Sequence, residues 1–339
     1  MSRVLRGTLR LAILGLALAS PAMMPAQPAA AKGGQHQAAA SSVPPLTYQT
    51  KNAPVESAPV TYLVFWGQQW ATGWSDVSSS GTVYSSSQAQ AYITGFFKYL
   101  GSTSTNWNSS QTQYCSGVAV GTVNCGSSGV HVASTPVAFG GAWVDTTSPP
   151  PPPVVPDNCA AVVCLNPTGG ITDQGNVLGQ EAIRAETHFL GASGYQQGAN
   201  YMIFLPKATA TPGYGVYCAY HSEVIDSNGH DVTFTNMPYV MDLNQFCGTN
   251  FVNSTDNAFG NGWFDGYSIV AGHEFAEAET DPFPAAATAW LDSSQQETGD
   301  KCAWIAPGTP GGAYNIGPDS AGHTYAVQSL WSNLAMGCV

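Results

Sequence analysis

The pattern of apolar and polar residues in the first half of the chain predicts a buried strand followed by an amphipathic helix. Residues 61–66 form a largely apolar run, which is typical of a strand that is covered on both faces. Residues 88–100 repeat apolar side chains at helical spacing, after several serines that can cap a helix. The predicted apolar face of this helix is Ala89, Ile93, Phe96 and Leu100.

The second half of the chain continues this interleaving of strands and helices. A helix is predicted at residues 176–190, and a buried strand at residues 201–205 is ended by Pro206. Further strands are expected near residues 215–220 and 232–239, and a second long helix over residues 267–280, capped by Asp265 or Ser268. The pattern predicts an α/β or α+β fold with a mixed sheet.

The chain divides into an export signal, an N-terminal arm and one large domain. Residues 1–31 combine a basic start, a short apolar stretch and small residues, which predicts a cleaved secretory signal peptide. Residues 32–57 are rich in Ala, Gln, Ser and Pro, so we expect a disordered or extended arm. Residues 58–339 are then a single secreted domain, in which residues 148–156 form a proline-rich surface loop.

Composition excludes two classes of partner. The full chain contains 9 basic and 21 acidic residues; cleavage of the signal removes three arginines and no acid, which gives the mature chain a net charge near −15. Such a chain repels nucleic acid, and after signal cleavage it has no reason to bind an anionic membrane. Charged residues are only 9% of the chain, so we expect a surface of uncharged polar residues.

Eight cysteines in a secreted chain indicate four disulfide bonds. Eight cysteines allow 105 pairings, and a sequence does not decide among them. We predict sequential pairing, because the first four cysteines fall into two close pairs. The predicted bonds are Cys115–Cys125, Cys159–Cys164, Cys218–Cys247 and Cys302–Cys338.

The only segment that points to chemistry is the second long helix. Residues 273–277 read H-E-F-A-E, which is the zinc-peptidase motif H-E-x-x-H with glutamate in place of the second histidine. Residues four apart share a helix face, so His273 and Glu277 can bind one metal ion while Glu274 acts as a base. Glu297 follows Glu277 at about the distance at which thermolysin-like enzymes place their third ligand.

Negative charge is concentrated around this motif. Seven of the 21 acidic residues lie within residues 274–300, and Lys301 is the only basic residue nearby. Either solvent screens these groups on a surface, or a metal ion pairs with several of them. The seven are Glu274, Glu277, Glu279, Asp281, Asp292, Glu297 and Asp300.

The resulting hypothesis is a cation bound by His273, Glu277 and Glu297. Asp300 is an alternative third ligand, or a group that orients His273. Zinc is the expected ion, although two glutamates with one histidine also suit calcium. The competing interpretation is that His273 is a buried histidine bonded to a carboxylate without metal.

The neighbouring ionisable residues receive simpler roles. Glu274 and Glu279 point away from the face that carries His273 and Glu277, and Glu279 is expected to be exposed. We expect Asp281, which precedes a proline, to end the helix. His221, at a strand end, is expected to be structural, and the alternative is that it lines the cleft.

Several short segments together resemble a known family. In order and spacing they are similar to secreted bacterial proteins with an H-E-x-x-E motif followed by T-D-P, and more distantly to the plant phosphate-induced, EXORDIUM-like extracellular proteins. The resemblance implies one secreted, disulfide-bonded domain with the motif helix at its centre. The segments are residues 62–67, 113–115, 234–239, 272–282, 299–305 and 326–333.

Two functions follow from these observations. The first is a secreted metal-dependent hydrolase with a zincin-like domain, most simply a peptidase, in which Glu274 is the general base. Its partner is an extracellular protein, a peptide or cell-wall material. The second is a non-catalytic EXORDIUM-like protein of the cell wall with a structural metal or none, whose tryptophans and tyrosines contact carbohydrate.

Overall fold

The structure of the protein is a computed structural model. The predicted Cys159–Cys164 bond, the proline-rich loop and nearly all of the predicted signal peptide lie outside the residues that it describes. The described residues are 30–32, 43–102, 107–133, 137–147, 177–209 and 217–339.

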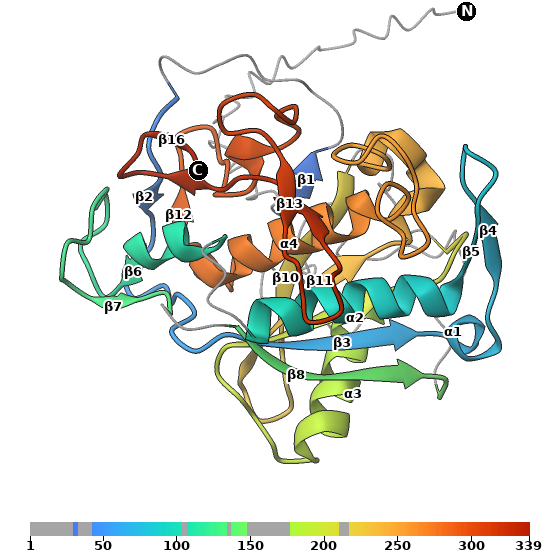
Figure 1. The fold of residues 1–339 in the computed structure, drawn as a ribbon. Coiled ribbons are helices and arrows are strands. Elements are labelled where there is room, and N and C mark those ends of the chain that lie inside the picture. The colour runs from blue at the N-terminus through green and yellow to red at the C-terminus, as the bar shows by residue number, and fades with distance from the viewer. Residues whose placement is uncertain (1–29, 33–42, 103–106, 134–136, 148–176, 210–216) are drawn as a thin grey trace, which may run out of the picture.

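A six-stranded mixed sheet forms the centre of the molecule (Figure 1). Four of the six strands, β8, β3, β9 and β11, are parallel to one another. Strand β10 runs antiparallel to β11, and β1 pairs antiparallel with β10 at the edge of the sheet. A mixed sheet was predicted, and this is confirmed. In sheet order the strands are β1 (Ala30–Lys32), β10 (Tyr217–Ile225), β11 (Asp231–Met237), β9 (Ala199–Phe204), β3 (Val60–Trp66) and β8 (Ala138–Asp145).

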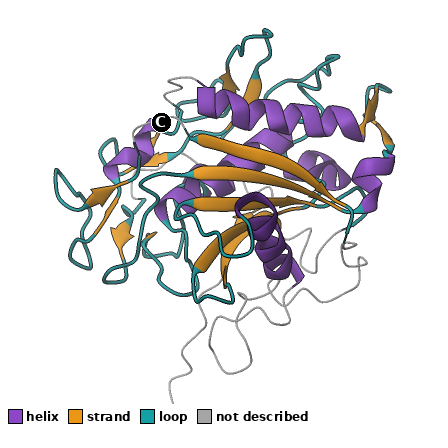
Figure 2. Cartoon of the chain, turned by 90° about the horizontal axis from the view of Figure 1, so that it is seen from below, coloured by secondary structure: helices purple, strands orange, loops and turns teal. Residues whose placement is uncertain are grey.

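Helices cover both faces of the sheet, as Figures 1 and 2 show. Helices α2 (Ser86–Ser102) and α4 (Asp265–Thr280) share one hydrophobic core with Leu63 and Phe65 of β3. Helix α3 (Val177–Leu190) packs with Val64 on the opposite face. Because successive residues of a strand point to opposite faces, the apolar run that predicted β3 serves both cores.

A third core joins the N-terminal segment to the end of the chain. Leu46 and Tyr48 have no exposed surface and pack with Trp290 and Trp331. Strand β2 (Thr47–Tyr48) pairs with β12 (Trp290–Leu291). Residues 43–57, which were predicted to be part of a disordered or extended arm, are therefore ordered, because their apolar side chains are buried by residues far along the sequence.

Smaller elements complete the chain. Two-stranded ribbons and short helices make up most of the remaining described elements. They are α1 (Gln68–Thr72), β4 (Ser75–Val77), β5 (Val83–Ser85), β6 (Cys115–Ser116), β7 (Val130–His131), β13 (Tyr314–Ile316), β14 (Tyr325–Val327), β15 (Trp331–Ser332) and β16 (Gly337–Cys338), with the 3-10 helices η1 (Ser109–Gln113), η2 (Val240–Cys247) and η3 (Asp300–Cys302).

Three disulfide bonds form among the described cysteines, all with the predicted partners. Cys218–Cys247 ties strand β10 to the segment that precedes α4. Cys302–Cys338 ties η3 to the end of the chain. Loops of this length are worth roughly 3–4 kcal/mol when closed, so both elements are held firmly beside the motif helix. The third bond is Cys115–Cys125.

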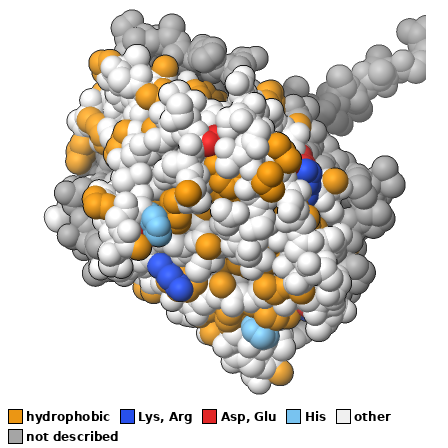
Figure 3. Space-filling model, turned by 45° about the vertical axis from the view of Figure 1, so that its right-hand side comes forward, with side chains coloured by type: hydrophobic (Ala, Val, Ile, Leu, Met, Phe, Trp, Pro, Cys, Tyr) orange, Lys and Arg blue, Asp and Glu red, His pale blue; other side chains and the backbone are white. Residues whose placement is uncertain are grey.

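The surface has the character that the composition predicts. Figure 3 shows only scattered charged side chains on the face that it presents, among uncharged polar side chains, backbone atoms and many hydrophobic side chains. Within the described residues, no helix has the length and apolar character needed to span a bilayer.

Candidate metal centre

The motif helix α4 lies inside the molecule, with all sixteen of its residues buried. It begins at Asp265, but the Asp265 carboxylate accepts backbone N–H groups of Gly262, Val252 and Asn253 instead of capping the helix. The prediction that Asp265 or Ser268 caps the helix is wrong. The N-cap position is occupied by Phe264, whose side chain makes no capping hydrogen bond. The helix ends at Thr280, ahead of a proline.

One group of possible ligands surrounds His273. The Nε2 atom of this residue lies 3.0 Å from Oε1 of Glu277 and 3.9 Å from Oδ1 of Asp300. The backbone N–H of Asp300 donates to the same Glu277 oxygen over 2.9 Å. All three side chains are buried, and these atoms are close enough together to bind one metal ion.

Gln328 fixes the ring of His273. Its Nε2 group donates to the Gly299 carbonyl over 2.7 Å, which turns its Oε1 atom toward the ring. His273 Nδ1 lies 3.1 Å from that oxygen and must donate to it, since the amide oxygen only accepts. The lone pair of the neutral ring is therefore on Nε2, which faces Glu277 and Asp300. Metal-binding histidines are commonly oriented by such a partner.

The backbone of Gly299 permits this close packing. A Cβ atom at this position would lie 2.8 Å from Nδ1 of His273 and 3.0 Å from Oε1 of Glu277. The φ of Gly299 is −77°, which any residue can adopt, so the backbone conformation does not require glycine. Glycine is required because a side chain would not fit in this space.

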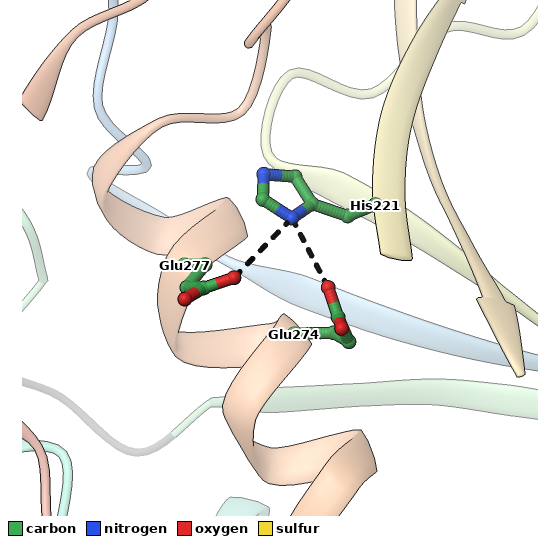
Figure 4. Close-up of side chains that lie close together, drawn as sticks. All are labelled: His221, Glu274 and Glu277. Atoms are coloured by element: carbon green, nitrogen blue, oxygen red, sulfur yellow. Dashed lines mark hydrogen bonds and ion pairs between the residues drawn. The ribbon is translucent and has the colours of Figure 1, made fainter. Parts of the chain in front are cut away.

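A second group forms around His221, which β10 brings to the other side of Glu277. His221 Nδ1 lies 3.3 Å from Oε2 of Glu274 and 3.9 Å from Oε2 of Glu277 (Figure 4). His221 Nε2 donates to the backbone carbonyl of Asp281 over 3.0 Å. These three side chains have no exposed surface, and they also satisfy the spacing of a metal site.

Glu297 forms an ion pair with His221, and no ion pair between it and His273 is found among the described residues. Its Oε1 atom is 3.8 Å from His221 Nε2, and neither of its carboxylate oxygens has a hydrogen-bond partner in the described part of the chain. Asp300, the alternative ligand, takes the place beside His273 and Glu277 that was predicted for Glu297. Which of the two binds metal stays a prediction.

The charges of the cluster depend strongly on one another. Burial lowers the pKa of both histidines, but the surrounding carboxylates outweigh it and raise the pKa to about 10 for His273 and about 9 for His221. Burial raises the pKa of Glu274 and Glu297. Burial also acts to raise the pKa of Glu277, yet His273 and His221 hold it below its usual range. Without a cation the cluster therefore retains protons, which a bound cation would displace.

Basic side chains do not neutralise the centre of this cluster. Among the described residues, no Lys or Arg forms an ion pair with Glu277 or Glu297; Lys301, the nearest in sequence, bonds to Asp292 over 2.6 Å. A buried carboxylate needs a positive partner or a proton. The side chains present therefore suit a cation, which would meet imidazole nitrogens and carboxylate oxygens.

Two predictions about neighbouring residues are wrong. Glu279 is buried instead of exposed, and Asn108 donates to its carboxylate. Glu274 points into the cluster, because α4 is enclosed on all sides and β10 covers the flank that it faces. His221 lies in the cluster beside Glu274 and Glu277, and whether its role is structural stays a prediction. Its one signal in the sequence was a pair of ionisable residues, His221 and Glu223, in a strand that is buried along nearly all of its length.

No protein-family model, curated protein or solved structure matches this chain.

Proposed function

We propose that the protein is a secreted metal-dependent hydrolase with a zincin-like domain. One observation carries the proposal: Gln328 leaves the Nε2 lone pair of His273 facing two buried carboxylates, Glu277 and Asp300. A lone pair and carboxylate oxygens repel one another unless a proton or a cation lies between them. A helix with H-E-x-x-E beside a mixed sheet supports the same proposal.

The donor atoms favour zinc over calcium. Imidazole nitrogens are good zinc ligands, whereas calcium takes about six to eight oxygen ligands. His273, Glu277 and Asp300 would hold the ion, with Glu297 as the alternative to Asp300. Three protein ligands leave one position of a tetrahedral zinc ion for water, as catalytic sites require.

The residues of the chain would divide the work of hydrolysis. Zinc, when bound, lowers the pKa of a coordinated water toward about 7. Glu274 would accept the proton of that water and return it to the leaving group. Its partner His221, at 3.3 Å, would hold the Glu274 carboxylate in place. Burial of the cluster excludes bulk water and strengthens each of these interactions.

An extended peptide is the proposed substrate. Strand β10 carries His221, and its outer edge pairs with β1, with Ala30 opposite Tyr220. This edge pairs with an extended segment of the chain itself, and a peptide substrate would bind there in the same way once the signal peptide has been cleaved, as sheet edges bind peptides.

The rival proposal of a carbohydrate-contacting wall protein loses support. It relied on aromatic residues forming a surface, but seven of the nine tryptophans are buried. They pack in the hydrophobic cores and not on an open face.

The test combines metal content with turnover. Purified wild type should contain zinc by elemental analysis, and His273→Ala should lose the ion beside it. Glu274→Gln should keep that ion and the fold but lose turnover of a peptide library, because the amide cannot accept a proton. Glu223→Gln is the matched control. Glu223 is a buried carboxylate of the same strand as His221, and it accepts the backbone N–H of Ala286 over 2.6 Å.

The outcomes separate the two functions. Loss of turnover in Glu274→Gln but not in Glu223→Gln supports the hydrolase. A folded wild type that binds no zinc when zinc is offered would overturn it and leave the non-catalytic protein.

A further inference from the structure

The two oxygens of the Glu277 carboxylate face different histidines. Oε1 lies 3.0 Å from Nε2 of His273, and Oε2 lies 3.9 Å from Nδ1 of His221. Oε2 has no hydrogen-bond partner in the described part of the structure, although Glu277 has no exposed surface. A carboxylate placed in this way has the geometry to bridge two cations, one beside each histidine.

The two histidines repeat the same arrangement. Each uses one ring nitrogen to donate to an oxygen that can only accept: the side-chain oxygen of Gln328 for His273, and the backbone carbonyl of Asp281 for His221. Each turns its remaining nitrogen toward two carboxylates, one of which is Glu277. The geometry that makes His273 a ligand is therefore present a second time.

We propose that the centre binds two divalent cations bridged by Glu277, the second of them held by His221 and Glu274. This rests on the metal centre proposed above but not on hydrolysis. The separations of 3.3 and 3.9 Å from His221 to the two carboxylates suit a small divalent ion. Ligand atoms around tetrahedral zinc lie about 3.3–3.6 Å apart, given bonds of about 2.0–2.2 Å.

Charge favours two cations over one. Two divalent cations balance the four negative charges of the carboxylates in this cluster, which are Glu274, Glu277, Glu297 and Asp300. Bound carboxylate-bridged ions are typically about 3.5–4 Å apart, which one shared glutamate allows. Glu297 is fully buried, and neither of its carboxylate oxygens has a hydrogen-bond partner among the described residues. Its negative charge is therefore further support for a second cation besides the one next to His273.

A second cation changes the part played by Glu274. When His221 and Glu274 hold an ion, Glu274 is a ligand; it is free to accept a proton only when that position is empty. The two states give Glu274→Gln two separate effects, the loss of turnover and the loss of one bound ion.

The first experiment measures stoichiometry on the intact secreted protein. After removal of metal by a chelator, zinc is titrated by calorimetry and bound zinc is counted by elemental analysis. We expect two equivalents in wild type and one in each of His221→Gln, His273→Gln and Glu274→Gln. The control is His323→Gln, because His323 also pairs with an acid, Asp319 at 3.3 Å, but is partly exposed and far from α4 in sequence. It should keep both ions.

A second measurement needs no variant and so does not depend on mutant folding. Wild type loaded with Mn²⁺ should show the exchange-coupled electron paramagnetic resonance spectrum of two bridged ions. A six-line spectrum of isolated Mn²⁺ together with one equivalent of zinc, unaffected by His221→Gln, would overturn the second position while leaving the proposed hydrolase intact. No bound metal at all would overturn both.

Discussion

Two buried acidic regions lie next to each other in this sequence and are neutralised in different ways. Asp292 bonds to Lys301 over 2.6 Å, and both side chains are fully buried. Lys301 also donates to the Pro44 carbonyl and lies over the ring of Trp331. Around Glu277 the only positive partners among the described residues are histidines, which can be neutral. A carboxylate with a permanent cation is structural, whereas one that faces only histidines leaves room for an external cation.

The largest effect is expected from Glu277→Gln. If Glu277 bridges the centre, its neutral analogue should remove all tightly bound zinc. Loss of a partner that merely orients a ligand already costs roughly 10–100-fold in affinity, and loss of a shared ligand should exceed this. Zinc titration by calorimetry measures the change. If Glu277→Gln bound zinc with wild-type affinity, the acidic region around Glu277 would not be one that a metal ion neutralises.

Asp292→Asn should reduce stability without changing metal content. It leaves the Lys301 ammonium buried without its anion, at a cost of about 3–5 kcal/mol in the free energy of unfolding. Denaturant unfolding of the metal-free protein measures this. The double variant Asp292→Leu with Lys301→Met should be more stable than the single variant, because it leaves no unpaired charge. A loss of zinc from folded Asp292→Asn would show that the two regions are not independent.

Glu56 is neutralised in a third way, by a proton. Burial raises its pKa from 4.5 to about 8. Its contribution to stability is full below pH 4.5, where the folded and unfolded states are both protonated, and is lost as the pH rises through 8. Glu56→Gln should therefore stabilise the protein at pH 7 by about 3 kcal/mol, at about 1.4 kcal/mol per pH unit.

The same variant carries its own control. At pH 4 wild type and Glu56→Gln should unfold at nearly the same denaturant concentration, since both side chains are neutral. If wild type and Glu56→Gln were equally stable at pH 7 as well as at pH 4, Glu56 would have an ordinary pKa.

Gln328→Leu tests the orientation of His273 and has the smallest expected effect. Without the acceptor for Nδ1 the ring is no longer fixed, so zinc affinity should fall roughly 10–100-fold. Gln328→Glu keeps an acceptor at that position and should retain more of the affinity. If both variants bind zinc like wild type, the orientation of His273 does not depend on Gln328.

The elements with local sequence signals were predicted well. Helix α2 was expected at residues 88–100 and extends over Ser86–Ser102, with every residue of its predicted apolar face buried. Strand β3 begins and ends within one residue of its apolar run. The described disulfide bonds join the predicted pairs. In each case the signal lies within a few residues or in the order of the cysteines.

The candidate site was predicted only as far as one helix reaches. The four-residue spacing of His273 and Glu277 determined that their side chains lie side by side, because an α-helix repeats every 3.6 residues. Glu274 was predicted as a base that points away from this face, and it lies in the cluster, 3.3 Å from His221. The faces of a helix are known from its sequence, while the neighbour that covers each face is not.

The sequence by itself thus determined the motif helix, the strands and the concentration of acid around residues 274–300. Only the tertiary structure decided that His221 belongs to the site, that Asp300 lies beside His273, and that Glu279 is buried. His221 is 53 residues from Glu274 in sequence and reaches it because β10 pairs with β11 and packs against α4. Periodicity is encoded by neighbouring residues, whereas contacts between distant segments depend on how the whole chain packs.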